Sequence, residues 1–192
     1  MGGECLPCPT NTYDSSGTDS TLQSCLPCEP GTVSSPGSTE CRVPTTISVD
    51  RASAFAAAIL DAGTGDTVEL ASDVTFSGDF GFHASAPSAN SAFSIAEKVI
   101  SVSCDDPAAK CAISGSDERR AFYIFTNSRD EPAVSLADIR FTAGKSPDGD
   151  ISGGGGLRVY QSRVAIAGCE FSSNVARYDT FNDYTGASFS GR

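Results

Sequence analysis

Several features that would place a protein in a familiar functional class are missing from this sequence. Its 192 residues include no tryptophan, one methionine and one histidine. No run reaches the roughly 18 apolar residues that a membrane-spanning helix needs, so we expect no membrane insertion within this segment. Lys and Arg cluster nowhere beyond Arg119-Arg120, and the formal net charge is −11 at pH 7. Because phosphate recognition requires clustered cations, these counts exclude nucleic acid as a partner.

The N-terminus, Met1 to Cys5, also lacks the basic and apolar regions of a secretory signal peptide. The cysteine content nevertheless calls for an oxidising compartment. We therefore expect the chain to be a piece of a longer secreted or membrane-anchored protein, with the signal peptide and any membrane anchor outside it. The predicted location is extracellular or at the cell surface.

The sequence does contain abundant cysteine, and five of its eight cysteines fall within the first 41 residues. Cys5-Leu6-Pro7-Cys8 and Cys25-Leu26-Pro27-Cys28 repeat at an offset of 20 residues. The residues between them are mostly small and polar, so covalent links must hold this segment folded. Two kinds of link fit the spacing, a four-cysteine zinc site or a ladder of disulfides. The additional Cys41 and the scarcity of Lys and Arg favour the disulfides, and we expect no metal ion.

The run from Cys25 to Cys41 resembles the cysteine-rich repeats of ephrin-receptor-like modules and, more loosely, EGF and tumour-necrosis-factor-receptor repeats. The preceding repeat departs from that pattern at Asn11, where the family has Gly. The resemblance implies the disulfides Cys8–Cys25 and Cys28–Cys41. It leaves Cys5 to pair with a cysteine outside this chain.

After Pro44 the composition becomes that of a packed domain. Alternation over residues 45–49 predicts a strand, and an Ala-rich apolar face predicts a helix over residues 53–62. Asp50 or Ser53 can cap this helix, and Gly63 can end it. Gly65-Asp66 then turns the chain into a second predicted strand at residues 67–70.

This order of strand, Ala-rich helix, Gly-Asp-Thr and strand resembles the N-terminal cap of right-handed parallel β-helix proteins of the pectate-lyase type. The resemblance implies an all-β fold class, a right-handed parallel β-helix with an N-terminal capping helix, preceded by a small disulfide-rich module. The expected domains are residues 1–43, the cysteine-rich ephrin-receptor-like or EGF-like module, and residues 44–192, the cap and first rungs of a truncated β-helix.

A repeat at a fixed offset of 30 residues supports this expectation. Val134–Phe141 aligns with Val164–Phe171, and Gly156–Val159 aligns with Gly186–Phe189. Matched apolar positions at a fixed period indicate strands that stack on their equivalents one turn away. Further strands are expected, with less regular spacing, at residues 74–76, 98–102, 112–114 and 122–125.

Two short motifs lie within this repeat. Gly154-Gly155-Gly156-Leu157 and Phe171-Ser172-Ser173-Asn174 resemble motifs of polymorphic outer-membrane proteins and related adhesin-like β-helices. We expect Phe171 to fill the interior and Asn174 to occupy a left-handed corner, where its side chain can bond backbone groups. The predicted structural-motif residues are Gly155, Gly156, Leu157, Phe171 and Asn174.

The remaining cysteines have separate interpretations. Cys104 and Cys111 flank Asp105-Asp106-Pro107, and we expect a local disulfide between them. Cys169 takes the inward position that Ile139 holds one repeat earlier, and it is interpreted as a small buried hydrophobe rather than a reactive thiol. The expected free thiols are therefore Cys5 and Cys169.

Candidates for catalysis are few. His83 is the only histidine, and no Gly-x-Ser-x-Gly elbow supplies a nucleophile for it. Asp148-Gly149-Asp150 lacks the further ligands of a calcium loop, and Gly153 to Gly156 lacks the Lys of a phosphate loop. We therefore predict no catalytic residue and no cofactor.

Carboxylates on neighbouring strands would be the signature of a polysaccharide-active enzyme. The candidates here are Asp138, Arg140 and Glu170, of which the last two should be neighbours. An ordinary ion-pair ladder explains these residues, since no second carboxylate pair lies beside them.

The leading hypothesis is a non-catalytic extracellular or cell-surface structural segment of the adhesion type, with a polysaccharide or a cell-surface protein as its partner. The alternative is the N-terminal part of a polysaccharide-active β-helix enzyme (lyase, hydrolase or epimerase) whose catalytic rungs lie beyond residue 192. A third hypothesis is a receptor-like module in which the cysteine-rich repeats recognise a ligand.

Overall fold

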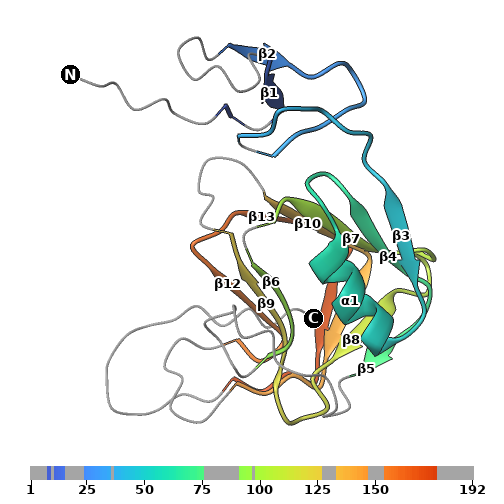
Figure 1. The fold of residues 1–192 in the computed structure, drawn as a ribbon. Coiled ribbons are helices and arrows are strands. Elements are labelled where there is room, and N and C mark those ends of the chain that lie inside the picture. The colour runs from blue at the N-terminus through green and yellow to red at the C-terminus, as the bar shows by residue number, and fades with distance from the viewer. Residues whose placement is uncertain are drawn as a thin grey trace, which may run out of the picture.

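The computed structural model describes residues 8–9, 11–15, 24–35, 37–75, 91–96, 98–126, 133–146 and 154–176. Within these ranges the chain forms one helix and fourteen strands. Figure 1 shows a small N-terminal segment beside a larger body of strands and one helix. Strands make up 46% of the described residues and the helix 8%, so the architecture is mixed rather than purely β.

The N-terminal segment is held together mainly by covalent links. β1 (Thr12–Asp14) and β2 (Cys25–Pro27) form a two-stranded antiparallel sheet. Disulfides join Cys8 to Cys25 and Cys28 to Cys41. Ser34 is buried beside β1 and donates a hydrogen bond from its hydroxyl to the carbonyl of Thr12 at 2.7 Å. The expectation of disulfides in this segment is confirmed.

The larger body contains three parallel sheets. The five-stranded sheet has the order β13-β10-β7-β4-β3. Its strands are β3 (Thr46–Val49), β4 (Thr67–Leu70), β7 (Ile100–Cys104), β10 (Val134–Ala137) and β13 (Val164–Ala167). The other two sheets are smaller, with the orders β14-β11-β8-β5 and β12-β9-β6.

The four-stranded sheet consists of β5 (Val74–Thr75), β8 (Cys111–Ser114), β11 (Ile139–Thr142) and β14 (Glu170–Ser172). The three-stranded sheet consists of β6 (Ser91–Ala96), β9 (Arg120–Phe125) and β12 (Leu157–Tyr160). Along the chain, one strand from each sheet follows the next, and each strand pairs with its equivalent from the previous pass.

The 30-residue repeat correctly predicted the pairing of the later strands. Val134 pairs with Val164 in the five-stranded sheet, and Phe141 pairs with Phe171 in the four-stranded sheet. The residues Gly186 to Phe189, which also belong to the predicted repeat, lie outside the described residues. Stacking at this period places apolar side chains directly above one another, because the side chains of a strand alternate between its two faces.

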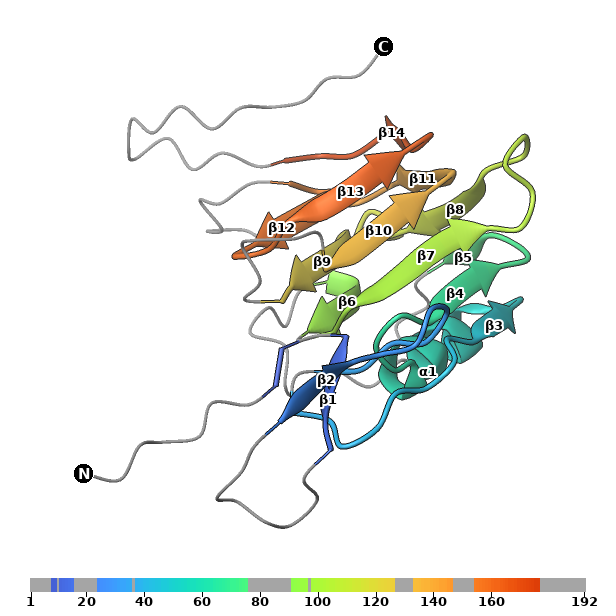
Figure 2. The same cartoon turned by 90° about the horizontal axis from the view of Figure 1, so that it is seen from above.

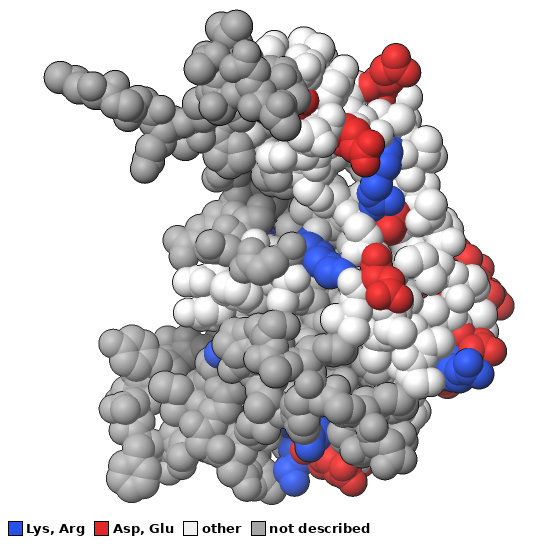
Figure 3. Space-filling view, in the orientation of Figure 1, with Lys and Arg blue, Asp and Glu red and all other residues white. Residues whose placement is uncertain are grey.

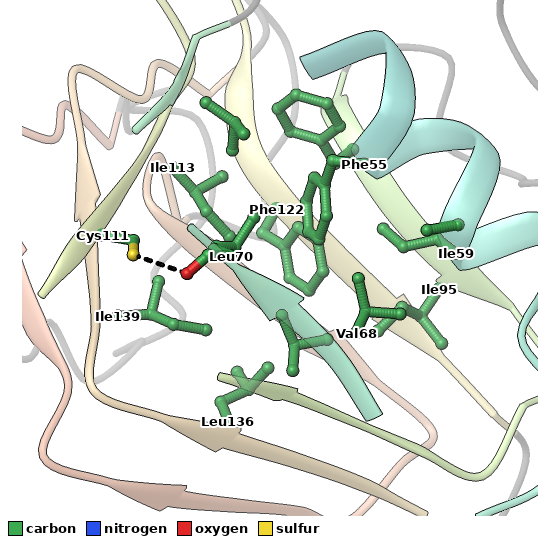
Figure 4. Packing of buried hydrophobic residues seen from close by; sticks show 14 of the residues in the cluster. Phe55, Ile59, Val68, Leu70, Ile95, Cys111, Ile113, Phe122, Leu136 and Ile139 are labelled. Atoms are coloured by element: carbon green, nitrogen blue, oxygen red, sulfur yellow. Dashed lines mark hydrogen bonds between the residues drawn. The ribbon is translucent and has the colours of Figure 1, made fainter. Parts of the chain in front are cut away.

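The inward side chains of the three sheets form a single apolar core (Figure 4). Val68, Ile113 and Ile124 represent the three sheets in it, and each is fully buried. Aromatic rings connect successive layers, since Phe122 lies 6.1 Å from Phe55 and 5.9 Å from Phe141 between ring centroids. Burial of each such side chain stabilises the fold by about 1.5–3 kcal/mol relative to exposure.

Helix α1 (Ala52–Asp61) packs against β3, β4, β5 and β6 at one end of the core (Figure 2). The predicted helix is confirmed, and Phe55, Ala58 and Ile59 are its buried residues. The predicted N-caps are wrong, because Arg51 occupies the N-cap position without a side-chain cap bond. Ala62 is the C-cap, so the helix ends directly before Gly63. Instead, the ammonium group of Lys98 donates to the carbonyls of Leu60 and Ala62, where the helix dipole favours a cation.

The predicted fold class, an all-β right-handed parallel β-helix, is wrong. The described residues form three separate parallel sheets of five, four and three strands, a small antiparallel sheet and a helix, not a closed β-helix. The five-stranded sheet has one strand more than the four-stranded sheet because α1 follows β3 directly, so the first pass contributes a helix in place of further strands. A period in the sequence predicts which strands pair, but it does not determine how the sheets close.

Corners between the sheets require left-handed backbone. Ala143 has φ of 47°, and Ser173, its equivalent one pass later, has φ of 54°. Asp138 and Gly168 form a second equivalent pair, with φ of 55° and 64°. A residue with a Cβ is strained in this region by about 1–2 kcal/mol.

Replacing Ala143 with Gly should therefore raise the free energy of unfolding. We expect a gain of roughly 0.5–1 kcal/mol, because relief of the strain exceeds the added entropy of Gly in the unfolded chain. The matched control is Ala137→Gly in the extended strand β10, which should lower the same quantity by about 0.5–1 kcal/mol. Urea titrations of both variants check this, and equal losses in the two would contradict it.

Candidate interaction surface

The outer face of the five-stranded sheet carries few charged residues. The inward residues of its middle strands are buried, and the residues between them point outward. Strand pairing aligns these outward residues in two rows. The first row consists of Thr46, Thr67, Ser101, Ser135 and Ala165. The second row consists of Ser48, Glu69, Ser103, Ala137 and Ala167. We call this surface the hydroxyl face; it looks toward the viewer in Figure 2.

The hydroxyl face can make hydrogen bonds but offers little for acid–base chemistry. Its side chains are Ser, Thr and Ala, with Glu69 as the single ionisable group in the two rows. Neighbouring strands lie about 4.8 Å apart, so equivalent hydroxyls repeat at that spacing. Each hydroxyl donates one hydrogen bond and accepts others. Such a surface suits a polar, uncharged partner that lies across several strands.

The four-stranded sheet carries its charges in pairs. The ammonium group of Lys110 contacts the carboxylate of Glu170, and the guanidinium of Arg140 lies 3.9 Å from the carboxylate of Asp73. The hydrogen bond from Lys110, together with its charge, lowers the pKa of Glu170, and Arg140 contributes to the same shift. The prediction that Arg140 and Glu170 are neighbours is confirmed by their strand pairing. On the face drawn in Figure 3, acidic and basic side chains of the described residues are interspersed.

Asp66 joins the cysteine-rich segment to the larger body. Its carboxylate is buried and accepts hydrogen bonds from the Arg42 guanidinium at 2.8 Å, from the Thr45 N–H at 2.7 Å and from the Gly63 N–H at 2.8 Å. Burial alone would raise the pKa of Asp66, but these hydrogen bonds outweigh it and hold the pKa far below its usual range. Arg42 also donates to the carbonyl of Thr64 at 2.6 Å. The Gly-Asp-Thr motif in the sequence predicted a turn at this position. It did not predict that Asp66 binds Arg42.

The two glycine- and asparagine-containing motifs meet at another corner. The Asn174 side chain accepts a hydrogen bond from the Gly144 N–H at 2.9 Å and donates one to the Phe141 carbonyl at 2.8 Å. A Cβ on Gly156 would lie 2.7 Å from the Asn174 amide nitrogen, and a Cβ on Gly155 would lie 2.4 Å from the Gly144 carbonyl oxygen. The backbone therefore excludes a side chain at Gly155, and a side chain at Gly156 would displace the Asn174 amide.

Two expectations about these motifs need correction. Asn174 bonds backbone groups as expected, but the left-handed residue at the corner is Ser173. Phe171 stacks on Phe141 with ring centroids 5.2 Å apart, yet it remains 40% exposed instead of filling a closed interior. Leu157, the remaining motif residue, packs against the core.

The third disulfide lies in the core. Cys104 and Cys111 are bonded as expected, and both are buried. With the exposed Asp105 they form the one group of metal-type ligands among the described residues. Because both sulfurs are shared in the disulfide, they are not available as thiolates for a metal ion.

Cys169 is a free cysteine and lies half-buried against the core. Burial raises the pKa of its thiol, which suits the predicted role as a small hydrophobe. Cys5, His83 and Asp148 to Asp150 lie outside the described residues.

The hydrogen bonds to Asp66 predict how stability depends on pH. Because the pKa of Asp66 is lower in the folded chain than in the unfolded chain, its contribution is present above about pH 4 and is lost as the pH falls below that value. Asp66→Asn should lower the free energy of unfolding by about 1–3 kcal/mol at neutral pH and should flatten its decline below pH 4. Urea titrations from pH 7 to pH 2.5 measure both effects. Asp50→Asn, which removes an exposed carboxylate, is the control, and an unchanged acid decline in Asp66→Asn would contradict the prediction.

Removing the Asn174 side chain should also destabilise the protein. Asn174→Ala leaves the Gly144 N–H and the Phe141 carbonyl without these bonds, at a cost of about 1–3 kcal/mol in unfolding free energy. Ser172→Ala, two residues away on the exposed side, should change this quantity by less than about 0.5 kcal/mol. The two variants are compared by urea titration, and a similar small effect in both would contradict the proposed role of Asn174.

Two further findings bear on the class of protein. Among the described residues, no helix has the length and apolar character needed to cross a bilayer. Comparison of the chain with protein-family models, with curated proteins and with solved structures finds no match.

Proposed function

We propose that this chain is a non-catalytic extracellular or cell-surface structural segment of the adhesion type, which binds an uncharged glycan along its hydroxyl face. The observation that carries the proposal is the hydroxyl face itself, in which outward Ser and Thr side chains repeat on adjacent strands. A glycan offers hydroxyls at many points along its length and can bond to several strands at once.

Charge favours a neutral glycan over an acidic one. The formal net charge of −11 repels polyanions, and neither row of the hydroxyl face contains a Lys or Arg that could attract them. Recognition of carboxylated or sulfated sugars relies on cations, and Arg in particular binds such groups through paired hydrogen bonds.

The charged residues considered as catalytic candidates support the non-catalytic assignment. Arg140 and Glu170 are engaged in ion pairs with Asp73 and Lys110, so these pairs stabilise the sheet. Asp138 occupies a left-handed corner. The three disulfides are consistent with an oxidising, extracellular location.

Binding to immobilised neutral and acidic polysaccharides, with and without calcium, tests the proposal. We expect retention on a neutral glucan or mannan, weaker retention on polygalacturonate, and no release of reducing ends or unsaturated products. The double variant Ser101→Lys/Ser135→Lys should lose at least tenfold in affinity, because two bulky cations would interrupt one row of the hydroxyl face.

Thr75→Lys is the matched control, since Thr75 is an exposed hydroxyl residue on the four-stranded sheet. It should bind like the unmodified chain. Turnover of any polysaccharide would instead support the enzymatic alternative, and equal losses in Thr75→Lys and the double variant would contradict the assignment of the binding face.

A further inference from the structure

The Cys28–Cys41 disulfide closes a ring of backbone directly before Arg42. Val33 lies inside this ring, and Cys41 is the residue that precedes Arg42. Val33 and Arg42 exchange both of their backbone hydrogen bonds, each at 2.9 Å, as an antiparallel bridge. The disulfide and this bridge together fix the position from which the Arg42 side chain extends.

The ring packs on the turn between α1 and β4. The Arg42 guanidinium donates hydrogen bonds to the Asp66 carboxylate at 2.8 Å and to the Thr64 carbonyl at 2.6 Å. A Cβ on Gly65 would lie 2.7 Å from a methyl group of Val33, so the ring and the turn are in direct contact. The closed ring therefore holds Arg42 against the larger body.

Asp66 extends this contact into the five-stranded sheet. Its carboxylate accepts the N–H of Thr45 before β3 at 2.7 Å, and its carbonyl accepts the N–H of Ser101 in β7 at 2.9 Å. In the described part of the chain, Arg42 is the one cation that forms an ion pair with Asp66. Removing the partner of a buried charge is strongly destabilising, because the remaining charge stays out of water without compensation.

The disulfides differ in how accessible their cysteines are. We call Cys28–Cys41 the ring disulfide and Cys104–Cys111 the core disulfide. Both cysteines of the ring disulfide are half-buried, whereas those of the core disulfide are each 5% exposed. Thiol–disulfide exchange needs an attacking thiolate to reach a disulfide sulfur, so an external thiol reduces the ring disulfide before the core disulfide.

We infer that the ring disulfide is a redox-sensitive switch that controls the alignment of β3, β4 and β7. An external dithiol supplies two electrons and two protons. The S–S bond breaks, Cys28 and Cys41 become thiols, and the dithiol is oxidised to a disulfide. The opened ring no longer holds Arg42 against Asp66, so the hydrogen bonds of Asp66 weaken and the first strands of the sheet loosen.

Amide hydrogen exchange during mild reduction tests this inference on the unmodified chain. We expect a low concentration of dithiothreitol to open the ring disulfide and leave the core disulfide bonded, as measured by peptide mass after alkylation. Exchange of the Thr45 amide, which bonds to the Asp66 carboxylate, should then accelerate at least tenfold. The Ala121 amide, which bonds to the Gly155 carbonyl in another sheet, should change by less than twofold.

A thermodynamic cycle separates the switch from the ordinary effect of a disulfide, which restricts the unfolded chain wherever it lies. Cys28→Ser/Cys41→Ser is made in the unmodified chain and in Arg42→Met/Asp66→Asn, which lacks both charges of the ion pair. We expect this substitution to raise the unfolding equilibrium constant at least tenfold more in the unmodified chain. Urea titrations of the four proteins measure this coupling.

Cys8→Ser/Cys25→Ser is the matched control, because it removes the other disulfide of the N-terminal segment and leaves the ring closed. Its effect should be the same in both backgrounds to within about threefold. Equal effects of Cys28→Ser/Cys41→Ser in both backgrounds would overturn the inference. An unchanged Thr45 amide after the ring opens, an equal acceleration at Ala121, or earlier reduction of the core disulfide would overturn it as well.

Discussion

Hydrogen bonds to Asp66, whose buried charge must be satisfied, align the first strands of the five-stranded sheet. Its carboxylate binds the N–H of Thr45 before β3, and its own carbonyl accepts the N–H of Ser101 in β7 at 2.9 Å. One residue therefore fixes the positions of three neighbouring strands. Because each later strand pairs in register with the one before it, this first alignment is passed along the five-stranded sheet. A buried carboxylate without these partners would cost several kcal/mol.

Side chains alternate along each strand, so one set packs in the core and stabilises the fold, and the other set is free to contact a partner. Inward residues such as Val68 and Leu136 contribute to one shared core, and their outward neighbours contribute little to it. On the four-stranded sheet the outward residues Arg140 and Glu170 form ion pairs with Asp73 and Lys110, which precede strands two places away in the sheet. On the five-stranded sheet the outward positions carry hydroxyls and methyls. The core therefore does not depend on the residues proposed to bind a partner, and these can be changed without loss of the fold.

The sequence predicted the features that depend on local pattern. The strand at Thr67–Leu70 and helix α1 followed from periodicity, and the 30-residue repeat predicted the pairing of Val134 with Val164. Features that depend on several distant segments were missed. In the sequence, Arg120 was noted only as one of two adjacent cations. In the structure it is fully buried, and its guanidinium donates a hydrogen bond to the carbonyl of Gly154 at 2.7 Å.

The 30-residue repeat could not predict how the three sheets close, because closure also depends on distant segments. A period reports that equivalent strands stack, and this is equally true of a closed coil and of separate sheets around a shared core. Phe55 of α1 begins an aromatic column that continues through Phe122 and Phe141 and reaches the surface at Phe171. The two ends of the column differ within the described residues: α1 packs at one end, and Phe171 is 40% exposed at the other.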